Sequence, residues 1–105
     1  MIRSFSYAAY SGLSEFIAAN PALAGSSDAD CLAAWARFWQ NSATAEFLRA
    51  YSETIGANPA LLPSLESAQQ LLDAYQLEKA AYELLYELNN RPEWLHIPLT
   101  GILDL

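Results

Sequence analysis

Aromatic and charged side chains alternate between residues 75 and 94, and they are the residues of this sequence best suited to binding a ligand. On a helix with 3.6 residues per turn, most of them share one side. They are Tyr75, Lys79, Tyr82, Glu83, Tyr86 and Asn90, with Arg91 and Trp94 just beyond the expected helix end. Ring faces match the C–H faces of sugars, while lysine, glutamate and tyrosine hydroxyl groups suit sugar hydroxyls. One interpretation is therefore a recognition surface for a polyhydroxylated ligand.

Two other interpretations of this side of the helix stay open. The simplest is a solvated surface on which Lys79 and Glu83 form an i,i+4 pair worth about 0.2 to 0.5 kcal/mol, with the tyrosines half-buried against neighbours. The other is a protein interface, because tyrosine, tryptophan and arginine are enriched at binding hot spots. Composition and spacing alone do not separate the three.

The opposite side of the same helix is apolar and is expected to face the core. It contains Ala74, Leu77, Ala81, Leu84, Leu85 and Leu88. A second broad apolar stripe is expected on the preceding helix, and it comprises Leu32, Trp35, Phe38, Trp39, Phe47, Leu48 and Tyr51.

Residues for catalysis are missing from the sequence, so we predict no catalytic residue. It has no glycine-rich phosphate loop, no His-Gly-Asp catalytic loop and no metal-binding Asp-Phe pair, which phosphoryl transfer requires. Glu83 and Glu87 lie four residues apart, but His96 is the only histidine, so we predict no metal site. Cys31 stands in an apolar run without a nearby histidine, which favours a buried structural thiol over a nucleophile.

Three long helices are predicted to carry these residues. Alanine and leucine dominate a composition that is 53% hydrophobic, which favours helix over strand. The first helix runs from Ile2 to the break at Asn20-Pro21, the second from about Asp28 to Ile55, and the third from a Ser64 cap to about Asn89. A turn is expected at residues 61–63, and short helical turns follow from residue 93 to the end. We therefore expect an all-α fold with one core, a single helical domain over residues 1–105.

Charge and composition exclude several classes of partner. The formal net charge is −7, and the five basic residues are scattered, whereas nucleic-acid binding needs clustered cations. The same acidity argues against an anionic membrane surface, and no apolar run approaches the roughly 20 residues of a membrane span. With a single cysteine, a cytoplasmic protein is the expectation.

A family resemblance emerges from several motifs together. The motifs are LLDAYQLEKAAYE at 71–83, YELNNRPEW at 86–94, IPL at 97–99 and GI at 101–102. They look like the C-terminus of maltokinases, and MIRSFSYAA at 1–9 looks like the helix that follows the metal-binding aspartate in the same family. The resemblance thus reaches both ends of the chain.

The resemblance implies a fragment of a protein-kinase-like enzyme that transfers phosphate from ATP to maltose and is often fused to trehalose synthase. The chain would be the small orthogonal helical bundle at the end of the larger lobe. ATP and magnesium would bind outside this chain, whose partners would be maltose and the rest of the parent. By the same resemblance Lys79, Tyr82 and Tyr86 would contact the sugar, with Glu83, Arg91 and Trp94 as further candidates.

Two hypotheses of function follow from different classes. In the first, the chain is a substrate-binding subdomain of a maltokinase linked to trehalose synthase, a transferase of carbohydrate metabolism. In the second, it is a free-standing helical module whose tyrosine and tryptophan side docks a protein. Excision from a larger lobe would also bare an apolar surface, through which the chain could form a homodimer.

Overall fold

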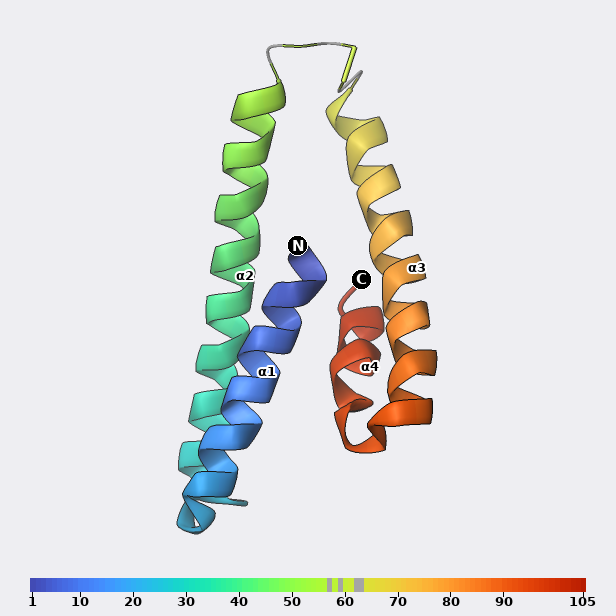
Figure 1. Cartoon of the computed structure of the whole chain (residues 1–105). Coiled ribbons are helices and arrows are strands. Elements are labelled where there is room, and N and C mark those ends of the chain that lie inside the picture. The colour runs from blue at the N-terminus through green and yellow to red at the C-terminus, as the bar shows by residue number, and fades with distance from the viewer. Residues whose placement is uncertain (57, 59, 62–63) are drawn as a thin grey trace. The chain divides into compact units, whose positions relative to one another are not determined.

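The computed structural model describes residues 1–56, 58, 60–61 and 64–105, and the described residues form helices and turns with no β-strand. Their elements are α1 (Ile2–Ala19), η1 (Pro21–Leu23), α2 (Ser27–Ile55), α3 (Leu65–Asn90), η2 (Pro92–Trp94) and α4 (His96–Leu103), where η denotes a 3₁₀ turn (Figure 1). The all-α prediction and the three long helices are confirmed. The C-terminal segment differs, because it forms a full helix, α4, where short turns were expected. The turn expected at 61–63 lies partly outside the described residues, which exclude Leu62 and Pro63.

Local side chains explain where the long helices begin. The Ser64 hydroxyl accepts a hydrogen bond from the Ser67 backbone N–H at 3.1 Å, as a helix N-cap does. The Ser26 hydroxyl accepts one from the Ala29 N–H at 3.3 Å at the start of α2. Gly25, just before it, has a φ of 72°, a left-handed conformation that side chains with a Cβ rarely adopt. These contacts lie within a few residues in sequence, so the helix starts were predictable.

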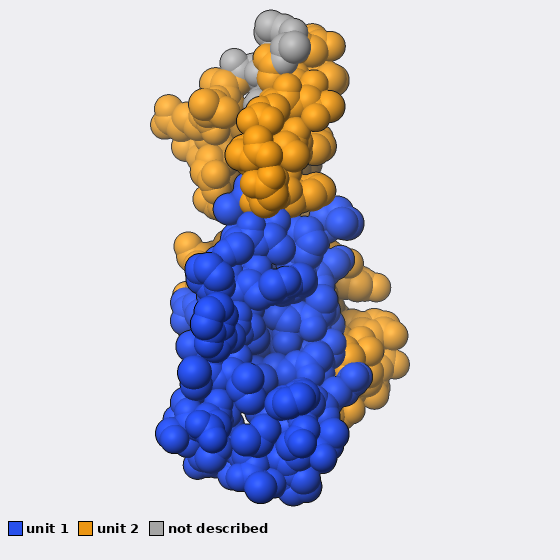
Figure 2. Space-filling model, turned by 90° about the vertical axis from the view of Figure 1, so that its left-hand side faces the viewer, with its two compact units in different colours: residues 1–45 blue, residues 46–105 orange. Residues whose placement is uncertain are grey.

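The chain divides into two compact units, residues 1–45 and residues 46–105 (Figure 2). In the first unit, Phe5 of α1 meets Trp39 of α2 edge-on, with ring centroids 6.3 Å apart and planes at 86°. In the second unit, α3 packs against α4 and η2. The expectation of a single domain stays a prediction.

A narrow strip of α3 faces α4 and forms the core of the second unit. Ala80 is fully buried, and Ile97 of α4 is only 1% exposed, with Pro98 buried beside it. The other buried positions of α3 are Glu83 and Glu87.

The leucine side of α3 is largely exposed, so its predicted place in the core is wrong. Leu77, Leu85 and Leu88 are each about half exposed or more, Ala74 and Ala81 are exposed, and only Leu84 is partly covered. The reason is geometric: α4 is short and touches one strip of α3. Successive residues of a helix are rotated by about 100° around its axis, so the leucines lie beside that strip and not within it.

The apolar stripe of α2 is not buried either. Trp35, Phe38, Trp39 and Tyr51 are exposed, while Leu32, Phe47 and Leu48 are partly covered. Cys31 is also exposed, not buried as expected, and it lines an apolar hollow of about 280 Å³ with Ala34, Trp35 and Phe38. Periodicity identified the apolar side of the helix, but burial requires another element to lie against it.

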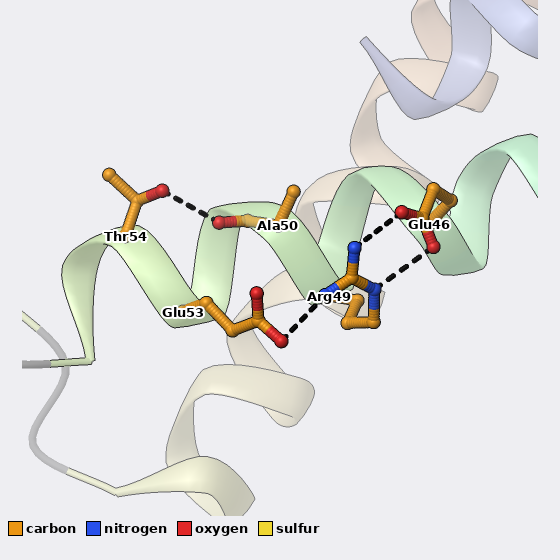
Figure 3. Close-up of polar contacts among 5 residues, drawn as sticks. All are labelled: Glu46, Arg49, Ala50, Glu53 and Thr54. Atoms are coloured by element: carbon orange, nitrogen blue, oxygen red, sulfur yellow. Dashed lines mark hydrogen bonds and ion pairs between the residues drawn. The ribbon is translucent and has the colours of Figure 1, made fainter.

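An arginine-centred ion network lies near the C-terminal end of α2 (Figure 3). Arg49 donates to the Glu46 carboxylate, with Nε 3.0 Å from Oε2, and to Glu53 Oε1 at 2.6 Å. The hydrogen bond from Arg49, and then its charge, lowers the pKa of the Glu46 carboxyl, and both carboxylates raise the pKa of Arg49. All three side chains are well exposed, so the network adds little to stability.

We expect Arg49→Gln to raise the pKa of the Glu46 carboxyl towards its ordinary value, as followed by NMR titration of the carboxyl carbon. Because the pKa of Glu46 is lower in the folded state, its pair with Arg49 contributes its full stability above the pKa of the unfolded chain. That contribution is lost as the pH falls through the pKa of the folded state. Arg37→Gln, an exposed arginine elsewhere on α2, should leave the Glu46 titration unchanged. An equal shift in both variants would rule out the direct contact.

A second expectation concerns the packing of α4. Ile97→Ala should lower the free energy of unfolding by about 2 to 4 kcal/mol, because it leaves a cavity against α3. Leu99→Ala on the same helix removes a side chain that is 46% exposed and should cost clearly less. Urea unfolding followed by circular dichroism measures both, and equal losses would contradict the packing of α4 on α3.

Candidate functional site

The end of α3 and the turn η2 together position one guanidinium beside two rings. Arg91 is the C-cap of α3, its backbone N–H bonds to the Glu87 carbonyl at 2.8 Å, and its φ of −145° takes the chain out of the helix. Pro92 then starts η2. The Arg91 guanidinium carbon lies 4.2 Å from the Trp94 ring centroid and 5.7 Å from that of Tyr86. We call Tyr86, Arg91 and Trp94 the arginine cluster.

A buried carboxylate holds this guanidinium in place. Arg91 Nε lies 2.9 Å from Glu87 Oε2, and Nη2 lies 2.8 Å from Oε1, a bidentate pair. The Glu87 side chain is 1% exposed, whereas that of Arg91 is 41% exposed. A buried carboxylate is costly unless it is paired in this way, so the pair restricts Arg91 to one orientation.

Glu87 was expected at most as a metal ligand, and its role in holding Arg91 was not predicted. The signal was present, because a glutamate four residues before an arginine on a helix is a favourable pair. The burial of Glu87 could not be predicted from this spacing, since burial depends on tertiary packing. Glu87 is thus a residue of the candidate site that was not among the predicted site residues.

A second cation–ring contact lies two turns earlier on α3. The Lys79 ammonium is 4.9 Å from the Tyr82 ring centroid, and the ring itself is 62% exposed. Such contacts contribute about 0.5 to 1 kcal/mol at exposed sites. The Lys79 ammonium thus contacts the Tyr82 ring. The expected contact was an ion pair with Glu83, four residues further along the helix.

The predicted site residues separate into an exposed group and one buried residue. Lys79, Tyr82, Tyr86, Arg91 and Trp94 lie at the surface or partly exposed. Glu83, which was also expected on the aromatic side, is only 9% exposed. An exposed tyrosine, Tyr75, extends the aromatic side towards the start of α3.

The chemistry that this surface supports is binding. Exposed rings can stack on an apolar ligand face, and the cations can donate hydrogen bonds to hydroxyl or anionic oxygens. Among the described residues, no three histidine, cysteine, aspartate or glutamate side chains gather to hold a metal ion. No helix of the described ranges is long and apolar enough to cross a membrane.

No protein-family model matches the chain, and no solved structure matches it. The kinase-lobe and maltokinase resemblance therefore rests on the sequence motifs quoted above. Those motifs coincide with the structured parts of the site, since the YELNNRPEW run spans the end of α3 and η2.

We expect Glu87→Gln to lower the free energy of unfolding by about 1 to 3 kcal/mol, because it removes a charge-assisted bidentate pair at a buried position. It should also loosen Arg91, seen as faster exchange of the Arg91 Nε–H signal by NMR. Glu78→Gln changes an exposed carboxylate of the same helix and should be nearly neutral. Indistinguishable stability of the two variants would contradict the role given to Glu87.

Proposed function

We propose that the chain is the helical C-terminal subdomain of a maltokinase-like domain associated with trehalose synthase, where it forms part of the wall that binds maltose. It contributes no catalytic residue. ATP and magnesium bind to other parts of the parent protein, which transfers phosphate to the sugar. The observation that carries the proposal is the coincidence of the motif residues with an exposed aromatic and cationic surface on α3 and η2.

The geometry of the arginine cluster supports sugar binding in particular. Trp94 and Tyr86 present ring surface of the kind that stacks on sugar C–H faces. Arg91 lies against both rings, and Glu87 fixes it before any ligand arrives. A pre-oriented donor loses less conformational freedom on binding, which favours a directional hydrogen bond to a sugar hydroxyl.

Lys79 and Tyr82 extend the same wall along α3. The ammonium can donate to a second hydroxyl while the Tyr82 ring stays exposed for stacking. Glu83 is only 9% exposed, and its part in sugar binding stays a prediction. The sugar contacts that we propose are therefore Lys79, Tyr82, Tyr86, Arg91 and Trp94.

Weak binding of maltose by the chain alone is the expected result, since one wall of a pocket supplies few contacts. In an NMR titration of the ¹⁵N-labelled chain, maltose should shift the signals around Tyr82, Arg91 and Trp94 with a Kd on the order of millimolar. Trp94→Ala and Tyr82→Ala should each reduce these shifts. Tyr51→Ala removes a similarly exposed tyrosine on α2 and serves as the matched control.

In the complete protein that carries this chain, Lys79→Ala or Tyr82→Ala should raise KM for maltose much more than KM for ATP. Unchanged maltose kinetics in both variants, together with no maltose-dependent shifts in the chain, would overturn the proposed function.

A further inference from the structure

The exposed apolar side of α3 carries a regular repeat that the maltose wall does not use. Ala74, Leu77, Ala81, Leu84 and Leu88 follow one another at alternating intervals of three and four residues, the a and d positions of a heptad. We call these five residues the leucine seam. It lies on a different side of α3 from Tyr82 and Tyr86, so its role is independent of sugar binding.

The seam is available to a partner over most of its length. Leu77 is 49% and Leu88 57% exposed, both alanines are exposed, and Leu84 is partly covered. Leu85, 62% exposed, widens the apolar surface at the neighbouring position. Large apolar side chains that recur in this way on one helix side mark interaction surfaces, whereas scattered ones do not.

The pattern specifies an α-helix as the occupant. Alanine at two of the three a positions, 74 and 81, leaves hollows beside Leu77 and Leu84. The side chains of a second helix can insert into these hollows at a crossing angle near +20°. From Ala74 to Leu88 the seam is about 21 Å long at 1.5 Å per residue. That length accommodates about two heptads of a partner helix.

Charge on the flanks specifies the character of that helix. Asp73 and Glu78 occupy the g and e positions beside the seam, and both are exposed, while the nearest cation of the helix, Lys79, lies over the Tyr82 ring. The whole chain has a net charge of −7. A second copy would bring like charges together, which opposes pairing at e and g positions.

We propose that the leucine seam docks an amphipathic α-helix of a partner protein, whose apolar seam is flanked by lysine or arginine. The partner helix covers Leu77 and Leu88, and its cations lie beside Asp73 and Glu78. The association requires neither maltose nor the arginine cluster.

A pair of designed peptides tests the proposal on the chain as it is. Both have about three heptads with leucine at a and d, and one carries lysine and the other glutamate at e and g. The like charges within each peptide keep it from pairing with itself. Fluorescence anisotropy of the labelled peptides should show the lysine peptide binding to the chain at least about tenfold more tightly than the glutamate peptide.

Substitutions then locate the binding to the seam. Leu77→Asp and Leu88→Asp should each lower the affinity of the chain for the lysine peptide by about tenfold or more. Each substitution places a charge in the interface where a leucine packed. Leu103→Asp changes an even more exposed leucine on α4 and should change the affinity by less than about twofold. Circular dichroism checks that each variant keeps its helix content.

Charge reversal gives a test that does not depend on removing apolar contacts. The double variant Asp73→Lys, Glu78→Lys should reverse the preference, so that the glutamate peptide binds more tightly. Three results would each overturn the proposal: no binding of the lysine peptide, equal binding by wild type and both seam variants, or sedimentation showing that the chain dimerises through Leu88. The last would identify a second copy as the occupant.

Discussion

The pair between Glu87 and Arg91 is the interaction on which the rest of the second unit depends. Its carboxylate is 1% exposed beside the packing of α4 on α3, and its guanidinium is partly solvated at the point where the chain leaves α3. A buried carboxylate without a partner is costly, so the pair ties the helix end to the path that the chain takes afterwards. The same bidentate contact orients Arg91 against Tyr86 and Trp94. Core and binding surface are therefore linked through one side chain.

Helix α3 presents three differently occupied sides. One narrow strip, centred on Ala80, packs against α4, the tyrosine and lysine side forms the proposed sugar wall, and the leucine seam forms the proposed docking surface. An ordinary surface helix pairs one apolar stripe with one solvated side. Here the apolar stripe and the packed strip do not coincide, which leaves leucines available for a partner.

Burial in the described residues is modest, and that shapes how the chain can function. Few large side chains are fully buried, whereas many aromatic and leucine side chains are at least half exposed. A short chain gains limited stability from its own core, so a partner that binds the folded form would stabilise it by mass action. This behaviour suits a subdomain that works against other parts of a larger protein, as the proposed function requires.

The sequence by itself determined the helices, because their limits depend on local interactions. The Ser64 cap, the Ser26 hydroxyl with the acidic first turn of α2, and the break at Asn20-Pro21 all act within a few residues, and the Glu87–Arg91 pair was readable as an i,i+4 spacing. Only the tertiary structure decided which sides of those helices are covered. Periodicity showed that α3 has an apolar side but not that Ala80 and Glu83 would be buried, or that Leu88 and Cys31 would stay exposed. The reason is physical: helix formation follows from neighbouring residues, whereas burial follows from which distant element lies against them.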